Sequence, residues 1–226
     1  MTPPNSTSGK ATGKQQRVIR GLDADQRREQ RRQALLDSAL ELFAAQGFVG
    51  TSIEQLCQHA YVATKSFYES FDSRDDLYAV LLRQITDGAF ARLATVAAEA
   101  PDEETGTRLM LAELAHAFVD DVRVAQVTFG QGSAITPVAE RQRRENRRAA
   151  AAFVEDLWVG YGTVVTERYH GIAIGLIGGL FDIIADWVLD VPAEGPTPAS
   201  VEELITRLSD FYGAVRSGSK PPAQSS

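Results

Sequence analysis

Cysteine is almost absent from this chain, since Cys57 is the only one among its 226 residues. An intramolecular disulfide is therefore impossible, and no group of cysteines can hold zinc. Residues 1–17 lack the apolar stretch that a signal peptide requires. The longest uncharged apolar run, residues 171–181, is too short to cross a bilayer. These absences favour a cytoplasmic protein with no membrane partner.

The motifs of common enzymes are also missing. The chain contains no HExxH and no GxSxG, and GKATGKQ at residues 9–15 does not have the spacing of a phosphate-binding loop. Its three histidines, His59, His116 and His170, are scattered along the sequence. We therefore expect no catalytic residue, no metal site and no cofactor. A helical enzyme is an alternative from another functional class, and these absences argue against it.

The net charge of −7 is unevenly distributed along the chain. Residues 1–50 carry eight Lys or Arg against five Asp or Glu, residues 51–80 carry two against five, and residues 81–226 carry thirteen against twenty. DNA responds to a local basic patch rather than to the total charge. The acidic balance is therefore compatible with DNA binding, although it does not establish it.

Strand-like alternation is missing as well, and apolar residues instead recur at helical spacing, which predicts an all-α fold. We expect helices over residues 23–46, 51–60, 63–70, 72–98, 105–127, 137–160, 164–189 and 199–216. The two ends, residues 1–22 and 217–226, lack periodic apolar residues and are expected to be disordered. The basic residues of the N-terminal end could follow a phosphate backbone as an arm, or could merely keep the protein soluble.

Residues 51–71, TSIEQLCQHAYVATKSFYESF, are expected to form two short helices joined by a tight turn. Thr51 and Glu54 have the spacing of a capping box at the start of the first helix. In the second helix Phe67 and Phe71 are four residues apart and can pack inward. The other side of that helix offers hydroxyls and an amine from Thr64, Lys65, Ser66, Tyr68 and Ser70. Such a face suits base edges and phosphate oxygens, although an ordinary surface hairpin would show the same pattern.

The order of residues around this hairpin closely resembles the DNA-binding domain of the tetracycline-repressor (TetR) family. The resemblance covers roughly residues 29–88 and is carried by Arg31-Arg32, Leu36, Ala39, Leu42-Phe43, Gly47-Phe48, Thr51-Ser52-Ile53, Leu56, Ala60, Val62, Phe67-Tyr68, Phe71 and Asp75-Asp76-Leu77. It implies a three-helix DNA-binding head with a helix-turn-helix, fused to a larger helical body that binds a small molecule and dimerises. The remaining helices resemble the family only in their arrangement.

The resemblance also implies roles for single residues. Thr51 and Ser52 would touch DNA phosphates, and Arg74 stands where the family commonly has a phosphate-contacting lysine. The residues that would lie in or beside the major groove are Thr64, Lys65, Ser66, Tyr68 and Ser70.

Three residues depart from the family pattern. Tyr61 stands where a glycine is usual in the turn, and a left-handed backbone there would cost a non-glycine residue about 1–2 kcal/mol. Cys57 replaces the usual alanine and is expected to be a small buried residue, with a redox sensor as the alternative. Glu69 lies beside the expected groove, where it would repel phosphate or accept a hydrogen bond from a cytosine amino group.

The body offers candidates for a ligand site and for a dimer interface. Candidate lining groups for a mostly apolar ligand, each of which core packing would also explain, are His116, Phe118, Phe129, Phe153, Trp158, Tyr161 and Phe181. Three glycines at intervals of four in the most apolar helix favour close approach of another helix, because each costs about 1 kcal/mol relative to alanine; the alternative is that they leave room for a ligand beside the helix. The expected dimer interface comprises Gly171, Gly175, Gly179, Leu204, Leu208 and Phe211. An arginine cluster within residues 141–148 is expected to be a solvated helix face, with an anionic ligand site as the alternative.

These patterns lead to one functional hypothesis. Residues 1–22 are taken as a basic arm, 23–76 as a helix-turn-helix DNA-binding domain, 77–216 as a helical ligand-binding and dimerisation domain, and 217–226 as a tail. The protein is expected to be a homodimeric transcriptional regulator, a repressor that a small, mostly apolar effector releases from a pseudo-palindromic double-stranded DNA operator. The alternative is a helical dimeric adaptor, or a small-molecule-binding protein that does not bind DNA.

Overall fold

The computed structural model describes the backbone of residues 15–130, 133–191 and 195–219, and the side-chain surroundings from residue 24 onward. These residues form nine α-helices and no β-strand, which confirms the expected all-α class. The helices in chain order are α1 (Gln15–Gln46), α2 (Ile53–His59), α3 (Thr64–Tyr68), α4 (Arg74–Glu99), α5 (Glu103–Val119), α6 (Val122–Thr128), α7 (Pro137–Gly160), α8 (Glu167–Leu189) and α9 (Pro198–Ser219).

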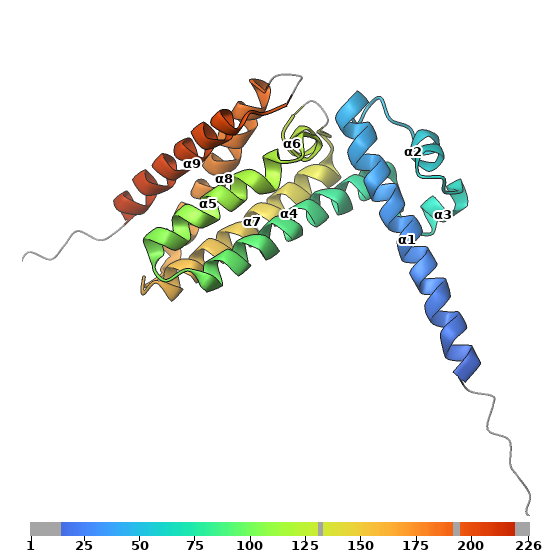
Figure 1. The fold of residues 1–226 in the computed structure, drawn as a ribbon, viewed down its shortest axis with the longest axis horizontal. Coiled ribbons are helices and arrows are strands. Elements are labelled where there is room, and N and C mark those ends of the chain that lie inside the picture. The colour runs from blue at the N-terminus through green and yellow to red at the C-terminus, as the bar shows by residue number, and fades with distance from the viewer. Residues whose placement is uncertain (1–14, 131–132, 192–194, 220–226) are drawn as a thin grey trace, which may run out of the picture.

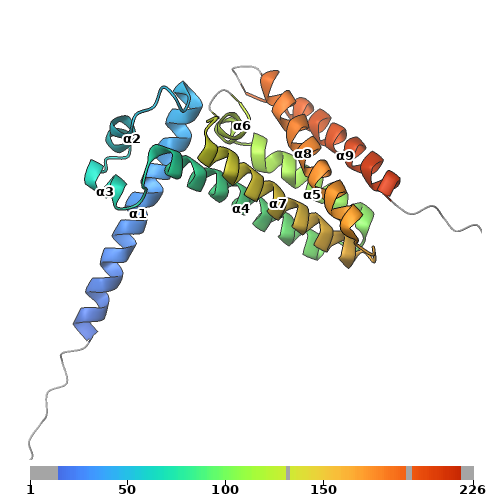
Figure 2. The same cartoon turned by 180° about the vertical axis from the view of Figure 1, so that it is seen from behind.

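A small head and a larger body make up the molecule (Figure 1). The head consists of α1, α2 and α3, and the body is a bundle of long helices with the short α6 at the end nearest α1 (Figures 1 and 2). The helix α4 packs on α1 in the head and continues along α5 and α7 in the body. A three-helix head fused to a larger helical body is the arrangement that the sequence predicted.

Aromatic and aliphatic side chains fill the head. Leu36 and Phe43 of α1 are fully buried together with Leu56 of α2 and Phe67 of α3. Removing each such side chain from water contributes about 1.5–3 kcal/mol. A buried hydrogen bond also links the first two helices, because Ser38 Oγ donates to the Leu56 carbonyl at 3.1 Å. The α2–α3 hairpin is therefore fixed on α1 by its apolar side, and its other side faces solvent.

The head core is completed by residues from the body. Val127 of α6, Ala134 of the segment before α7 and Ala139 of α7 belong to the same buried cluster as the head residues. Tyr78 of α4 lies at this seam, and its hydroxyl donates to the Val127 carbonyl at 2.7 Å. The domain boundary expected after residue 76 therefore falls inside α4 and inside a shared core.

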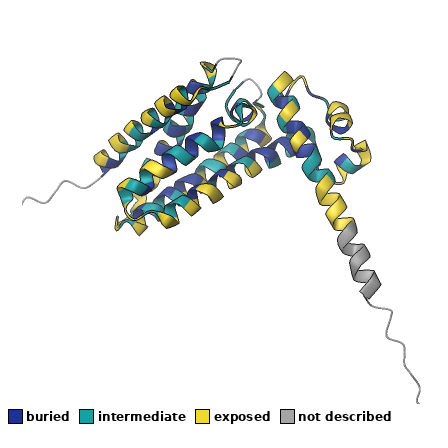
Figure 3. Cartoon of the chain, in the orientation of Figure 1, coloured by how far each residue is buried: buried dark blue, intermediate teal, exposed yellow. Residues whose placement is uncertain are grey.

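The most apolar helix, α8, packs against α7 and α9 in the body. By length and composition alone it would suit a membrane span. Its residues Ala173, Leu176 and Ile184 are buried against neighbouring elements, and α8 packs on both α7 and α9. Figure 3 shows buried positions on the inner sides of these helices and exposed positions on the outer sides. Packing within the body therefore accounts for part of its apolar composition, since 39% of its most apolar window is buried.

The first helix begins earlier than the sequence indicated. It runs from Gln15 for 32 residues, about 48 Å at 1.5 Å per residue, so the backbone of residues 15–22 is helical and not disordered as expected. That expectation relied on apolar periodicity, but glutamine, arginine and leucine extend a helix without it. Residues 1–14 of the expected arm lie outside the described residues. Residues 24–30 are all exposed, and α1 projects well beyond α2 and α3 (Figures 1 and 3).

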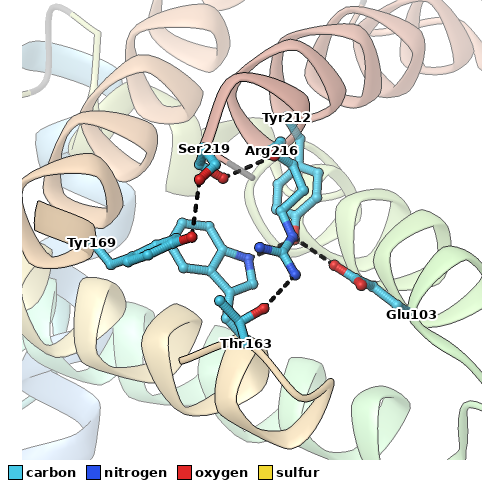
Figure 4. A network of polar contacts seen from close by, with 7 residues as sticks. Glu103, Thr163, Tyr169, Tyr212, Arg216 and Ser219 are labelled. Carbon is cyan, nitrogen blue, oxygen red and sulfur yellow. Dashed lines mark hydrogen bonds and ion pairs between the residues drawn. The ribbon is translucent and has the colours of Figure 1, made fainter. Parts of the chain in front are cut away.

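The last helix also extends further than expected. It continues to Ser219, so residues 217–219 of the expected tail are helical, and residues 220–226 lie outside the described residues. The Tyr169 hydroxyl donates to the Ser219 carbonyl at 2.9 Å, and Ser219 Oγ donates to the Arg216 carbonyl at 2.8 Å (Figure 4). The tail's composition could not indicate this anchor, because Tyr169 lies 50 positions earlier in the chain.

The helix expected over residues 105–127 is divided in two. The first part, α5, ends at Val119, and α6 begins at Val122 with Asp121 as its N-cap. The Asp121 carboxylate accepts from the Arg123 backbone N–H at 3.0 Å, and its hydrogen bond with the Arg123 guanidinium lowers the pKa of this carboxyl. Aspartate favours such caps over helix interiors, which explains the break.

Candidate nucleic-acid interface and effector cavity

The N-cap of the first hairpin helix lies one residue later than predicted. Ser52 is the N-cap of α2: its Oγ accepts from the Gln55 backbone N–H at 3.2 Å, and Gln55 Oε1 accepts from the Ser52 N–H at 2.7 Å. The capping box is therefore made by Ser52 and Gln55, not by Thr51 and Glu54. Thr51 is fully buried, and its hydroxyl donates to the Gly47 carbonyl at 2.8 Å. This position leaves the Thr51 hydroxyl no route to a phosphate, whereas Ser52 is partly exposed.

The turn between α2 and α3 contains a left-handed residue. Tyr61 has a φ of 53°, and no other non-glycine residue in the described ranges has a positive φ. The turn thus keeps the left-handed backbone although glycine is absent. The Tyr61 side chain is 97% exposed, so burial of the ring offsets none of the strain. The turn is closed by the buried Val62, whose N–H donates to the Cys57 carbonyl at 2.9 Å.

One side of α3 is apolar and buried, and the other is polar and exposed. Phe67 is fully buried and Phe71 nearly so, with ring centres 5.7 Å apart. Because these rings fix the inward side, Thr64, Lys65 and Tyr68 face solvent, and the Lys65 side chain is 89% exposed. The other two expected groove residues, Ser66 and Ser70, are partly buried at the edge of this face. The five expected groove residues therefore lie on α3 and the two residues that follow it, and three of the five are exposed.

Glu69 lies next to this face, and its carboxylate offsets the charge of Lys65. Its carboxylate is 4.0 Å from Lys65 Nζ, and an exposed pair of this kind is worth about 0–1 kcal/mol. The Arg28 guanidinium of α1 donates to the Glu69 carbonyl at 2.9 Å and brings a further positive charge to the end of α3. The sequence did not indicate this arginine, because the contact joins residues 41 positions apart.

Arg74 links the start of α4 to the segment between α1 and α2. Its Nη1 donates to the Thr51 carbonyl, and its guanidinium carbon lies 4.2 Å from the centre of the Phe48 ring. The side chain is partly exposed, so a phosphate contact by Arg74 would be made by a guanidinium that is already fixed in place.

Cys57 lies on the inner side of α2 and is 4% exposed. Burial raises the pKa of its thiol, which keeps the sulfur protonated and unreactive near neutral pH. This environment fits the small buried residue that was expected and does not fit a redox sensor.

A cavity of about 270 Å³ lies in the body between α4, α5, α7, α8 and the segment that follows α6. Phe118, Phe129 and Phe181 form an aromatic wall, with ring centres 5.2, 5.6 and 5.8 Å apart. Arg143 and Arg147 of α7 contribute two positive charges to the lining. The other lining residues are Leu82, Thr86, Thr128, Ser133, Asn146, Gly178, Asp182 and Ala185. The cavity therefore combines an apolar wall with a basic one.

Three of the seven candidate ligand residues line this cavity, and the other four lie elsewhere. Trp158 is fully buried in the body core. His116 is partly exposed and pairs with a neighbouring aspartate at 2.8 Å. Phe153 borders a second, apolar cavity of about 50 Å³, which Phe181 also borders. Tyr161 ends α7 and lines neither cavity.

The expectation of a uniformly solvated arginine face on α7 was wrong for two residues. Three arginines of the cluster are exposed: Arg141, Arg144 and Arg148. Arg143 and Arg147 are instead partly buried, because their spacing of four places both on the side of α7 that continues the buried Ala139 and Ala150. This spacing was the signal in the sequence that pointed to the cavity lining.

The expected dimer residues fall into two groups. Leu204 and Leu208 are fully buried in the core of their own chain, so they are not available to a partner subunit. The apolar side of α9 on which they lie is used in packing on α5 and α8. A Cβ at Gly179 would collide with the Phe211 ring of the same chain, so this glycine serves the α8–α9 contact.

Gly171 and Gly175 form the second group. Both are exposed, and apart from the adjoining residues and backbone of α8 itself, no atom of the described residues lies within 4 Å of a Cβ built on either of them. Of the three glycines in the series, these two leave an open helix surface for a partner.

The head matches a known protein family. Residues 35–81, from the middle of α1 into α4, match the family model "Bacterial regulatory proteins, tetR family". The HTH-type transcriptional regulator RutR of Escherichia coli (strain K12) is 35% identical over 78 residues, which cover 34% of this chain and 32% of that protein. The HTH-type transcriptional regulator YuxN of Bacillus subtilis (strain 168), described as uncharacterized, is 21% identical over 162 residues, or 71% of this chain. The chain spans 56% of the length of YuxN.

The similarity of fold extends into the body. The crystal structure of the transcriptional regulator FadR from Bacillus subtilis, in complex with stearoyl-CoA, superposes with a TM-score of 0.62 at 15% identity. The superposition covers 83% of this chain and 99% of that chain, so head and body together share the fold. The sequence match is therefore to the helix-turn-helix domain of the tetracycline-repressor (TetR) family within residues 35–81, and the similarity of fold to solved bacterial regulators extends over head and body together.

Proposed function

We propose that the protein is a homodimeric, effector-responsive transcriptional repressor that acts in the cytoplasm and has no enzymatic activity. The observation that carries the proposal is the exposed polar face of α3, made by Thr64, Lys65 and Tyr68 and fixed from behind by the buried Phe67. This face lies within the segment that matches the family model.

The chemistry of this face suits DNA. The hydroxyls of Thr64 and Tyr68 can donate or accept at base edges, and the Lys65 ammonium can donate to guanine or phosphate. Ser52 and Arg74 are partly exposed in the same head and would hold phosphates on either side of the groove. The serines at the edge of the face, Ser66 and Ser70, would contact the adjoining backbone.

A second copy of the chain would supply the second head. Two recognition helices separated by about 34–36 Å read successive major grooves of a pseudo-palindromic site. We place the two-fold contact on α8 and α9, with the open surface at Gly171 and Gly175 facing the partner. Four helices packed across such an axis are a common dimer arrangement.

The cavity beside Phe118, Phe129 and Phe181 is the proposed effector site. It lies next to α4, the helix that the head and the body share. The structural neighbour FadR binds stearoyl-CoA, which supports a small-molecule effector in this fold. An effector changes DNA affinity only if it binds the two head spacings unequally.

Selection of bound fragments from genomic DNA, followed by affinity measurements on a selected fragment, tests the proposal. We expect Lys65→Ala and Tyr68→Ala each to lower DNA affinity about tenfold or more, while light scattering still reports a dimer. Arg148→Ala is the matched control, because it removes an exposed positive charge from α7. The wild-type affinity should also fall with rising salt, as counterion release requires. Absence of salt-dependent DNA retention by the wild-type protein would leave a helical adaptor as the better description.

A further inference from the structure

The two cavity arginines differ in how they are held. Arg143 donates from Nη1 to the Ala134 carbonyl at 2.8 Å and from Nη2 to the Tyr78 hydroxyl at 2.9 Å. Both acceptors are neutral oxygens. Within the described part of the chain neither Arg143 nor Arg147 forms an ion pair with a carboxylate, and Arg147 has no hydrogen-bond acceptor either. Partly buried guanidinium groups without an anion favour binding one.

Two further groups of the lining bear on an anion. Asp182 of α8 is the one carboxylate among the described lining residues and is exposed, so the lining carries two positive charges and one negative charge. Thr128 Oγ1 is buried and has no hydrogen-bond partner within the described residues. A buried hydroxyl without a partner costs about 1–3 kcal/mol, which an oxygen acceptor on a ligand would recover.

We propose that the cavity takes a small amphipathic carboxylate, whose carboxylate group binds between Arg143 and Arg147 while its apolar part lies on the Phe118–Phe129–Phe181 wall. This inference rests on the effector site proposed above and names its ligand class. The volume of about 270 Å³ is at the lower end of the usual range for ligand sites, roughly 300–1,000 Å³. A short carboxylic acid with an aromatic or aliphatic body matches that size.

The same arginine connects the ligand to the head. An anion that draws the guanidinium of Arg143 toward Arg147 competes with its hydrogen bonds to Tyr78 and Ala134. The Tyr78 ring packs on Phe43 and Phe48, with centres 5.7 and 5.4 Å away. Arg143 therefore binds Tyr78 directly, and Tyr78 in turn contacts two rings of the head. Displacement of Arg143 would change this contact between the head and the body.

Calorimetric titration of DNA-free protein tests the ligand class. The probes are octanoate and 3-phenylpropionate, each paired with its neutral amide, and acetate as the carboxylate without an apolar body. We expect each acid to bind about tenfold tighter than its amide, because hydrogen bonds to charged groups are worth about 1.5–3 kcal/mol. Acetate should bind more weakly than octanoate by about tenfold or more, since it buries no comparable apolar surface.

Three variants locate the carboxylate. Arg147→Gln should reduce the preference for acid over amide at least about fivefold, and Asp182→Asn should increase acid affinity. Arg141→Gln is the control, because Arg141 is exposed on the same helix outside the cavity. An equal affinity for acids and amides, an unchanged preference in Arg147→Gln, or equal binding of acetate and octanoate overturns the proposal.

Tyr78→Phe tests the connection to the head, since it keeps the ring and removes one acceptor of Arg143. We expect it to bind the acids more tightly than wild type and to show less release from DNA when they are added. Unchanged acid affinity together with unchanged release would refute the competition for Arg143. Intact DNA binding without acid binding contradicts only this inference, whereas acid binding without any DNA binding contradicts the proposed function.

Discussion

The guanidinium carbon of Arg216 lies 5.2 Å from the centre of the Trp158 ring, at the point where the end of α9 packs on the body (Figure 4). Arg216 Nε donates to the Glu103 carboxylate at 2.6 Å, and Nη2 donates to Thr163 Oγ1 at 2.7 Å. The Arg216 side chain is only 9% exposed, whereas that of Glu103 is 30% exposed. Water can therefore solvate Glu103 if its partner is removed, but it can hardly reach Arg216.

This asymmetry predicts unequal effects of the two truncations. Glu103→Ala leaves a buried guanidinium without its carboxylate and should lower the free energy of unfolding by about 3 kcal/mol. Arg216→Met leaves a carboxylate that water can reach and should cost less, about 2 kcal/mol. Arg207→Met is the control, because Arg207 of α9 pairs with Asp186 on the surface and should cost less than about 1 kcal/mol. Urea denaturation measures all three, and the reverse order for Glu103 and Arg216 would contradict the explanation.

Replacing Tyr61 by glycine should stabilise the head. The left-handed φ of 53° costs a non-glycine residue about 1–2 kcal/mol, and glycine gives back about 0.5–1 kcal/mol through its more flexible unfolded chain. The expected net gain in the free energy of unfolding is about 0.5–1 kcal/mol. Tyr61→Ala is the control, since alanine keeps the strain and the exposed ring contributes no burial. A gain of equal size in both variants would assign the effect to the ring instead of the backbone.

Two glycines of α8 should respond in opposite directions to alanine. Gly179→Ala should destabilise the body by about 1–3 kcal/mol, because the added methyl group would collide with the Phe211 ring. Gly175→Ala should stabilise an isolated chain by about 0.5–1 kcal/mol, because its Cβ meets open space and alanine favours the helix. Thermal unfolding of both variants at several protein concentrations provides the measurement.

The same pair also tests the proposed dimer. If Gly175 faces a partner helix, Gly175→Ala should weaken dimerisation. The gain in stability from the alanine should then be smaller at high protein concentration, where the wild-type protein is stabilised by dimerisation. A gain that does not depend on concentration would exclude Gly175 from the interface.

Cys57 should resist thiol reagents in the folded protein. Burial raises the pKa of its thiol and blocks access to the sulfur, so the reactive thiolate is scarce near neutral pH. We expect a disulfide reagent such as dithiobis(nitrobenzoate) to react at a rate that rises only with unfolding in urea. Rapid reaction of the folded protein, or loss of DNA binding on mild oxidation that Cys57→Ala prevents, would favour the redox sensor.

Alkaline pH should weaken the fold through Tyr78. Burial raises the pKa of its phenol above the ordinary value, and the neighbouring Arg143 opposes this only in part. A folded-state pKa above the unfolded value means that the stabilisation is fully present below about pH 10 and is lost as the pH rises through the folded-state pKa. Denaturation at stepped pH should therefore show a steeper alkaline loss of stability in wild type than in Tyr78→Phe. Equal slopes of stability against pH in the two proteins would show that a group other than Tyr78 causes the loss of stability at alkaline pH.

Local patterns predicted the parts of the fold that local contacts determine. The hairpin, the inward Phe67 and Phe71 and the outward Thr64, Lys65 and Tyr68 follow from helical spacing, and the structure confirms their placement. The position of the cap was wrong by one residue because threonine and serine are adjacent and both are good N-caps.

Contacts between distant segments could not be predicted in the same way. Arg143 reaches Tyr78 across 65 positions, so its place in the cavity depends on how α4 and α7 pack. The burial of Leu204 and Leu208 likewise depends on which neighbour takes the apolar side of α9. An apolar stripe shows that a helix packs against something, but it does not distinguish its own chain from a second copy.

The seam at Val127, Ala134 and Ala139 limits how freely this head could be exchanged with that of another protein. These residues fill the head core from the body side, so a head transplanted alone would lose the packing on that side, including the contact between Tyr78 and Val127. A chimera joined within α4 would keep the helix but lose the match between the two surfaces. The smallest portable unit is therefore the head together with α6 and the start of α7, which are separated from it in the chain by the whole of α5.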